Sequence, residues 1–288
     1  MRPTPRVALV SLLVALPLAA CGSGAPTGTP AASSASASAA SVPSASAPAD
    51  QAALDDQLLA AAWANDVAEA RRLIERGADV NTKDATQQSA YLVTTSEGYL
   101  ELLKVTLANG ARVDDKDSWN GTGLIRAAER GHFLVVGELL RAGIDRDHIN
   151  RIGYQAIHEA VLFGAETPEY AATVRVLAAG GVELDHRSPS AGLTPLEMAR
   201  ERRFPGLEGI LQSVIGAARP ADPDAALLRA AQAGDADAVA VALRAGANIE
   251  ARDPDGRTAL LLATARGHSP VQDVLVAMGA NPAASVDD

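Results

Sequence analysis

The feature of this chain that most constrains its fold is a glycine that recurs about every 33 residues, a spacing typical of repeat proteins. Each of these glycines ends a segment rich in Leu, Ile or Val, and Ala, Ile or Val follows it. Such a period indicates that one small unit of secondary structure is stacked several times. The glycines are Gly77, Gly110, Gly143, Gly181, Gly216, Gly246 and Gly279.

Two further markers keep the same register. A four-residue box that begins with Ser, Thr or Gln lies ahead of five of the glycines. A Gly-His or Gly-Tyr pair follows the box at a constant distance in three segments. The boxes are Ser89–Leu92, Thr122–Ile125, Gln155–His158, Thr194–Glu197 and Thr258–Leu261, and the pairs begin at Gly98, Gly131 and Gly267.

Together the markers resemble those of the ankyrin repeat family, which has the same period and a Thr-Pro-Leu-His box. The resemblance covers about residues 52–284. It implies an all-α ankyrin-repeat solenoid of about seven repeats within residues 51–288, each a helix-turn-helix with a finger loop. Because a single repeat cannot bury its own apolar face, we expect the repeats to stack with each unit touching only its neighbours.

Each marker has a physical role. We expect the box Thr to cap the first helix and the glycine between the helices to take a left-handed φ. Repeats one and six lack the box Thr, and an insertion, Ala165–Tyr170, separates the helices of repeat four. Repeat five has Arg203 where the inter-helix glycine belongs, so we expect either local strain of about 1 kcal/mol or a locally remodelled backbone there.

The first twenty residues have the layout of a secretory signal peptide. Met1–Arg6 contains two arginines and no acidic residue, and Val7–Ala20 is an apolar stretch too short to cross a bilayer. The stretch ends in Leu18-Ala19-Ala20-Cys21, which resembles the lipobox of bacterial lipoproteins. The resemblance implies cleavage before Cys21 and lipidation of that cysteine. The alternative is an ordinary signal peptide with a cysteine there by chance.

Residues 22–49 consist almost entirely of Ala, Ser, Pro, Gly and Thr. Such a segment cannot bury apolar surface, so we expect it to be disordered. We therefore divide the chain into a signal peptide (1–20), a lipidated cysteine with a tether (21–50) and a repeat domain (51–288). This organisation predicts an extracytoplasmic protein held on the bacterial cell membrane by its lipid anchor.

Charge and motif content exclude several function classes. The chain has 25 Lys plus Arg against 35 Asp plus Glu, so nucleic acid is not an expected partner. It has no phosphate-binding loop, nucleophile elbow or zinc signature, so we expect no enzyme and no cofactor. Asp147-His148 and Asp185-His186 occupy equivalent finger positions, but neighbouring repeats lie roughly 8–10 Å apart. That separation is too wide for one ion without adjustment, so we expect no metal site.

Ankyrin family members bind partners through the finger tips and the exposed side of the first helix. Carried over by register, these positions gather aromatic residues and arginines on repeats three and four, and such residues dominate interfaces. The expected partner-binding residues are Trp119, Arg130, Arg151, Tyr154, Leu162 and Phe163. The alternative is that Trp119 and Tyr154 only support the fingers while Phe163 compensates for the insertion.

These features predict a monomeric, membrane-anchored protein-binding module that recruits, shields or assists a partner protein. A specific inhibitor or accessory factor of an exported enzyme is the alternative function. A metal-dependent enzyme built on the two Asp-His pairs is the least favoured. The sequence does not name the partner, because a fold fixes the shape of a surface and not its ligand.

Overall fold

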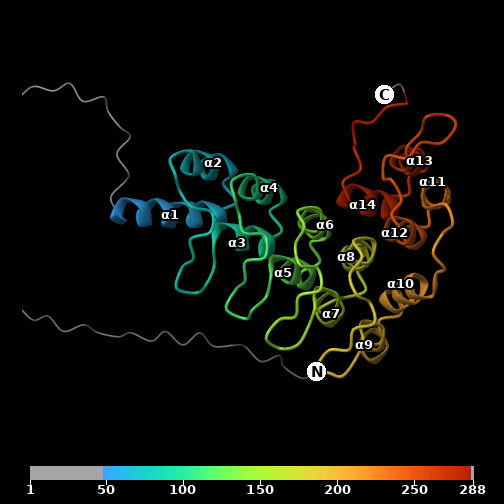
Figure 1. Cartoon of the computed structure of the whole chain (residues 1–288), viewed down its shortest axis with the longest axis horizontal. Helices are drawn as coiled ribbons and strands as arrows, with labels where there is room; N and C mark the ends of the chain where they lie inside the picture. The colour runs from blue at the N-terminus through green and yellow to red at the C-terminus, as the bar shows by residue number, and fades with distance from the viewer. Residues whose placement is uncertain (1–47, 287–288) are drawn as a thin grey trace, which may run out of the picture. The chain divides into compact units, whose positions relative to one another are not determined.

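The computed structural model describes residues 48–286, which form fourteen α-helices in seven consecutive pairs (Figure 1). The signal peptide, Cys21 and most of the expected tether lie outside the described residues. The first helices of the pairs are α1 (Pro48–Trp63), α3 (Ala90–Glu97), α5 (Gly123–Glu129), α7 (Ala156–Leu162), α9 (Pro195–Arg202), α11 (Pro223–Ala233) and α13 (Ala259–Arg266). The second helices are α2 (Val67–Glu75), α4 (Leu100–Ala108), α6 (Phe133–Arg141), α8 (Pro168–Ala179), α10 (Pro205–Gly216), α12 (Ala236–Arg244) and α14 (Ser269–Ala277).

This arrangement confirms the predicted all-α array of seven repeats, numbered here by helix pair from α1/α2 to α13/α14. The first helix begins at Pro48, so the last part of the segment assigned to the tether is helical. No helix within residues 48–286 combines the length and the apolarity that crossing a membrane requires.

The helix caps follow the sequence markers. The side chains of Ser89, Thr194 and Thr258 each accept a hydrogen bond from the backbone N–H three positions later, as an N-cap should. Thr122 occupies the same position, but its hydroxyl makes no capping bond. The residue between the two helices has a left-handed φ in repeat two, at Gly98, and also in repeat five, where Arg203 has a φ of 59°.

Successive fingers are linked by hydrogen bonds from one repeat to the next. A finger carboxylate or amide oxygen accepts the backbone N–H at the start of the following finger, at 2.7–2.8 Å. The three pairs that link the fingers of repeats two to five are Asn81 with Arg112, Asp114 with Asp145, and Asp147 with Glu183. These bonds hold the fingers in register, so matching residues of successive repeats lie at equivalent places.

The stack of first helices is interrupted after repeat five. Helices α1, α3, α5, α7 and α9 pack in sequence, and α11 packs on α13, whereas α9 and α11 are joined mainly through their partners α10 and α12. The spacing of the repeats contracts between Gly216 and Gly246, because residues 217–222 replace a finger. Because no finger continues the register, repeats six and seven are not stacked along the same direction as repeats one to five (Figure 1).

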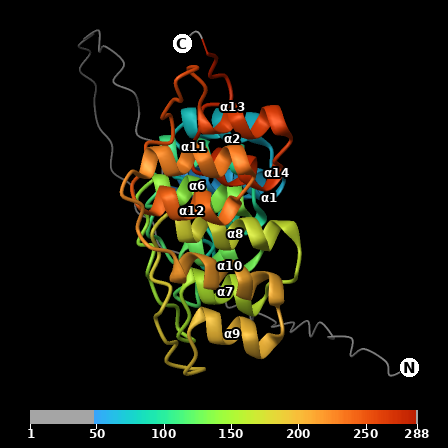
Figure 2. The same ribbon diagram turned by 90° about the vertical axis from the view of Figure 1, so that its right-hand side faces the viewer.

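Repeats six and seven fold back onto repeats three and four. Helix α12 packs on α8, and α14 packs on both α6 and α8 (Figures 1 and 2). The expectation that each repeat touches only its neighbours is therefore wrong. The second helices of repeats three to seven share one core, which is continuous from Tyr91 to Ala280.

Small residues and arginines make this closure possible. Gly137 in α6 faces the backbone of α14: a Cβ built on Gly137 would lie 2.1 Å from the Ala277 carbonyl oxygen. Arg141 donates a hydrogen bond to the same carbonyl. On α12, Arg244 donates to the carbonyl oxygens of Ala178 (3.0 Å) and Val182 (2.9 Å), at the end of α8. Cations favour helix C-termini, so Arg244 stabilises both α8 and the closure.

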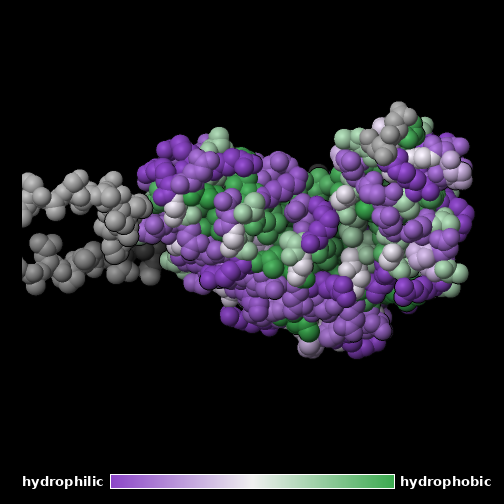
Figure 3. All heavy atoms as spheres, turned by 45° about the horizontal axis from the view of Figure 1, so that its top comes forward, coloured by the Kyte–Doolittle hydropathy of each residue, from purple (hydrophilic) through white to green (hydrophobic). Residues whose placement is uncertain are grey.

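Helix α8 is built for burial on several sides. Seven of its twelve residues are buried, against two of nine in α2, whose outer side faces solvent. An ion pair at the contact joins Arg175 of α8 to Asp237 of α12, with Nε and Oδ1 2.7 Å apart. On the face seen in Figure 3, apolar side chains gather between the N-terminal and C-terminal repeats, and polar side chains cover the margins.

Candidate functional site

A cleft of about 190 Å³ lies between the fingers and first helices of repeats three and four. Its rim carries three large apolar side chains that are exposed: Trp119 (56%), Phe163 (53%) and Ile152 (43%). The described part of the chain exposes few large apolar side chains, so three around one cleft need an explanation. The remaining lining residues are Asp117, Gly121, Ile125, Arg126, Glu129, Asn150 and Glu159.

The finger of repeat three holds Trp119 outward. Asp117 anchors the turn: its Oδ1 accepts the backbone N–H groups of Trp119 and Gly121, both at 2.8 Å. A bridge between Lys116 and Thr122 closes the loop below. Because an Asx turn fixes the backbone on both sides of Trp119, the finger itself sets the position of this residue, and more than half of its surface is exposed.

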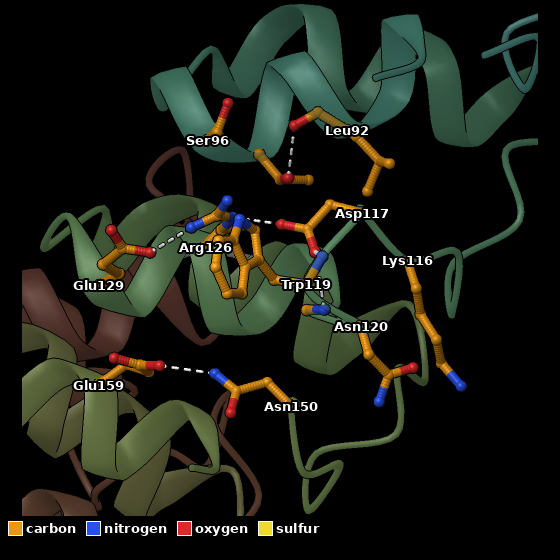
Figure 4. A network of polar contacts seen from close by, with 12 residues as sticks. Leu92, Ser96, Lys116, Asp117, Trp119, Asn120, Arg126, Glu129, Asn150 and Glu159 are labelled. Atoms are coloured by element: carbon orange, nitrogen blue, oxygen red, sulfur yellow. Dashed lines mark hydrogen bonds and ion pairs between the residues drawn. The ribbon is translucent and has the colours of Figure 1, made fainter. Parts of the chain in front are cut away.

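The floor of the cleft in repeat three is a charged network. Arg126 of α5 donates from Nε to Asp117 Oδ2 at 2.5 Å and from Nη1 to Glu129 Oε2 at 2.7 Å (Figure 4). The Asp117 side chain is almost fully buried. Arg126 is therefore neutralised by two carboxylates, and its orientation is fixed from both sides.

Repeat four builds the equivalent pair with different chemistry. Asn150 is the counterpart of Asp117 one repeat later, and Glu159 is the counterpart of Arg126. Asn150 donates from Nδ2 to Glu159 Oε1 at 2.6 Å, while its Oδ1 accepts the Tyr154 N–H at 2.9 Å. Asn150 keeps the turn-forming role of Asp117, but the helix residue that it contacts is an acid, Glu159, where repeat three has a base.

The position of Arg126 and Glu159 is apolar in the three other repeats that have the box. The equivalent residue is Val93 in repeat two, Met198 in repeat five and Leu262 in repeat seven, and all three are buried. An apolar residue therefore satisfies the fold at this position. Repeat six also has a charged residue at this position, Arg229, but Arg229 is exposed. Among the described repeats, Glu159 is the one charged residue that is buried there, which favours a role in binding over a role in folding.

Glu159 is the most perturbed carboxylate of the cleft. It is 3% exposed, and its Oε2 has no hydrogen-bond partner within the described chain. Burial raises the pKa of Glu159 from its ordinary 4.5 to about 7, although the hydrogen bond from Asn150 lowers it. The charge of Glu129 raises this pKa further and that of Arg126 lowers it. Glu159 is thus half protonated near neutral pH.

The structure brings two of the six predicted partner-binding residues, Trp119 and Phe163, into this cleft. Arg130 lies beside it at the end of α5, where its guanidinium donates to the Ser96 carbonyl (2.9 Å) and to Glu97 Oε1 (2.5 Å) of repeat two. Arg151 is exposed, and its backbone N–H donates to the Trp119 carbonyl at 2.9 Å. These two arginines border the site but do not line it.

Tyr154 and Leu162 are partly buried against the core. Tyr154 stacks on His158, with ring centroids 5.9 Å apart. The contacts of Tyr154 agree with the alternative, in which it supports the finger. Trp119 and Phe163 are more than half exposed, and their role in binding stays a prediction.

The sequence-based prediction missed Glu159 and its partners Asp117, Arg126 and Asn150. A signal was present, because aligning the boxes shows a charge at a position that is otherwise apolar. This position is not one of the finger and helix positions through which ankyrin family members bind partners, so the family pattern does not point to it.

Three residues of the two Asp-His pairs, Asp147, His148 and His186, make contacts within the fold. Asp147 Oδ1 accepts the Glu183 N–H at 2.7 Å, and His148 Nε2 lies 2.8 Å from the Asn120 carbonyl oxygen. His186 meets His158 edge to face, with ring centroids 6.0 Å apart, and burial lowers the pKa of His158 to about 4. Within residues 48–286, no three His, Cys, Asp or Glu side chains come close enough to hold a metal ion.

Comparisons with known proteins agree with the markers. The family model described as "Ankyrin repeat" matches residues 255–287. The ankyrin repeat protein YahD of Escherichia coli (strain K12) is 34% identical over 146 residues, covering 50% of this chain and 71% of YahD. A transient receptor potential cation channel subfamily A member 1 homolog of Caenorhabditis elegans is 27% identical over 67% of this chain, but only 16% of the channel is covered.

A solved structure gives the same result. The crystal structure of an ankyrin repeat domain from Acinetobacter baumannii superposes with a TM-score of 0.51 at 40% sequence identity. The match covers 54% of this chain and 78% of that domain. Together with the paired helices, the capped boxes and the relation to YahD, this match shows that the chain belongs to the ankyrin repeat family.

Proposed function

We propose that this protein binds a partner protein through the cleft between repeats three and four. Ankyrin repeats generally mediate protein–protein interaction, and the scaffold is typically not enzymatic. The observation that supports this cleft is the exposure of Trp119, Ile152 and Phe163 around a polar floor. Exposed aromatics beside fixed charges are typical of interface hot spots.

The test compares two exposed tryptophans in one chain. Trp119 lies at the cleft and Trp63 at the end of α1, with 56% and 48% of their surfaces exposed. The partner is co-purified from detergent-solubilised membranes of the source organism, identified and purified. Trp119→Ala is expected to weaken its binding about thirtyfold, the effect of losing about 2 kcal/mol. Phe163→Ala should act similarly, and Trp63→Ala should bind like wild type.

Circular dichroism checks that every variant is folded. If folded Trp119→Ala and Phe163→Ala proteins bind as tightly as wild type, the partner site lies elsewhere. An exported enzyme as the captured partner, with activity that changes on binding, would favour the inhibitor or accessory role over general recruitment.

We also propose that Cys21 carries a lipid that holds the protein on the outer side of the membrane. The supporting observation is the lipobox ahead of a low-complexity tether. Cys21→Ser is expected to move the protein from the membrane to the soluble fraction, whereas Ser23→Ala should leave it on the membrane. Equal fractionation of Cys21→Ser and wild type would rule out the anchor. We further propose that the anchored protein is a monomer, which light scattering of the Cys21→Ser protein would test.

A further inference from the structure

Acidic residues outnumber basic residues in the lining of the cleft. Asp117, Glu129 and Glu159 are acidic, and Arg126 is the one basic residue of the lining. Arg126 is already bound by Asp117 and Glu129, so it has little positive charge to offer an incoming group. An acidic ligand would meet the carboxylates of Glu129 and Glu159, and their repulsion disfavours it. The charge of the cleft therefore fits a cation.

One acceptor of the cleft has no partner. Glu159 Oε1 accepts from Asn150, but Oε2 is buried and accepts no hydrogen bond within the described chain. A buried acceptor without a donor costs free energy, so such groups are rare unless a ligand supplies the donor. Because Met198 and Leu262 fill the same position in sister repeats, the fold does not require this cost.

The walls of the cleft suit a long side chain with a charged end. Trp119 and Phe163 are aromatic and Ile152 is aliphatic, and all three are exposed at the rim. Lysine and arginine pack their methylene stems on apolar surface, and their cationic ends are attracted to aromatic faces. A volume of about 190 Å³ is below the range of about 300–1,000 Å³ typical of small-molecule sites, so it fits one side chain better than a whole ligand.

We propose that the cleft receives a lysine or arginine side chain of the partner protein, with the Glu159 carboxylate as its acceptor. This inference rests on the proposed function and specifies the chemistry of the partner at this site. An uncharged side chain of similar length would fill the cleft but leave Glu159 Oε2 unpaired. A basic side chain would donate to Glu159 Oε2, match the negative charge of the cleft and pack against its aromatic rim.

The proposal predicts stronger binding as the pH rises from 6 to 8. Glu159 has a pKa of about 7, and only its deprotonated form carries the charge that attracts a cation. The charged groups that act on Glu159 come from α5, namely Arg126 and Glu129, with Asp117 bound to Arg126. Helices α8 and α9, which also pack on α7, contribute no charge to this shift. His158 stays neutral because burial lowers its pKa to about 4.

The test uses the indole N–H signals of the ¹⁵N-labelled full chain, which has two tryptophans. Trp119 reports on the cleft, and Trp63 is an internal control outside it. The probes are Nα-acetyl-lysine amide and Nα-acetyl-arginine amide, with the norleucine and glutamate analogues as neutral and acidic controls. The basic probes are expected to shift the Trp119 signal saturably at pH 8 and about tenfold more weakly at pH 6. The Trp63 signal should not move.

Two variants test the role of Glu159. Glu159→Gln keeps an acceptor for Asn150 but cannot become charged, and Glu159→Met copies the residue that repeat five has at this position. Both are expected to bind the basic probes about tenfold more weakly at pH 8 and to lose the dependence on pH. Equal shifts with norleucine, or unchanged binding by both folded variants, would overturn the proposal.

Binding of the identified partner to the variants distinguishes failure of this inference from failure of the proposed function. If Trp119→Ala weakens partner binding and Glu159→Gln does not, the basic side chain is wrong while the partner site stands. If neither variant weakens it, both proposals fail. Loss of binding in both variants, reproduced by replacing one Lys or Arg of the partner with norleucine or Met, supports both.

Discussion

Arg126 and Glu159 show how one register position acquires opposite charges in neighbouring repeats. Each is held by a residue of its own finger, Asp117 or Asn150. Arg126 is balanced by two carboxylates and remains partly exposed, whereas Glu159 is buried with one oxygen unpaired. The cost of burial therefore falls on Glu159, and its pKa rises to about 7.

This raised pKa makes a prediction about stability. The folded protein keeps the Glu159 proton up to about pH 7, whereas the unfolded chain releases it near pH 4.5. The unfolded state is therefore favoured progressively as the pH rises from 4.5 to 7. Glu159→Gln does not titrate, so its free energy of unfolding should exceed that of wild type above pH 7, by up to on the order of 3 kcal/mol. The two should be similar below pH 4.5.

Urea denaturation at pH 4.5, 6 and 8 measures this difference. A difference that is constant over the three pH values would mean that Glu159 titrates normally in the folded state. Asp55, which is buried in repeat one but accepts hydrogen bonds on both oxygens, offers a contrast. The Asp79 N–H and the Thr82 hydroxyl each donate to a different oxygen of Asp55. Asp55→Asn should destabilise the protein at neutral pH, because it replaces one of these two acceptors with an NH₂ group.

Helix α9 combines a strong start with a strained end. Thr194 and Glu197 form a capping box at its N-terminus, and Pro195 takes the first helical position. At the other end Arg203 has φ 59° and ψ 51°, a left-handed conformation that side chains with a Cβ disfavour by about 1–2 kcal/mol. The sequence correctly identified this position, because glycine occupies it in sister repeats, as at Gly98.

Arg203→Gly should therefore stabilise the protein by about 1 kcal/mol, with a rise in the melting temperature of about 2–4 °C. Arg202→Gly is the matched control, because Arg202 is the last helical residue of α9 and its guanidinium carbon lies 5.4 Å from the centre of the Phe204 ring. That change should destabilise the protein by about 1 kcal/mol. Two variants that shift the melting temperature in the same direction would refute strain at Arg203.

Helices α9 and α10 should open before the centre of the array. Helix α9 has a close first-helix neighbour on one side, α7, and lacks comparable packing on α11 at the other. Hydrogen exchange is expected to be faster in residues 200–223 than in residues 122–140. Uniform protection of the two segments would show that the break in the first-helix stack carries no local instability.

At the scale of the whole molecule, the closure of repeats six and seven onto repeats three and four depends on close backbone approach. Gly137→Ala would put a methyl group against the Ala277 carbonyl, so α14 must move away from α6. We expect a loss of about 1–3 kcal/mol in stability, faster hydrogen exchange in α14 and a larger radius of gyration. The prediction concerns the shape of the molecule as well as its stability.

Gly209→Ala provides the matched control. Gly209 lies inside helix α10, and a Cβ there would meet no atom within 4 Å. The same substitution should therefore stabilise the protein by about 0.5–1 kcal/mol through helix propensity. If both glycine variants are stabilised equally and keep the same radius of gyration, α6 and α14 do not pack closely in solution.

The repeat unit, the number of repeats and most of the helix ends could be predicted from sequence patterns alone. These depend on local chemistry: a Thr or Ser at the N-cap, a glycine with a left-handed φ, and apolar residues at helical spacing. The sequence also placed Trp119 and Phe163 at exposed positions by register, although the same rule failed for Tyr154 and Leu162, which are partly buried. The signal peptide and the Cys21 anchor remain predictions of the sequence.

The closure and the chemistry of the cleft depend on packing between distant parts of the chain and could not be predicted from these patterns. The repeat period records contacts between neighbouring repeats, whereas Gly137 and Ala277 belong to repeats three and seven and share no marker. Glu159 likewise has an ordinary pKa as an isolated residue, and its burial depends on what packs around it. Local patterns specify local structure, but desolvation and long-range packing are set by the surfaces that the folded chain brings together.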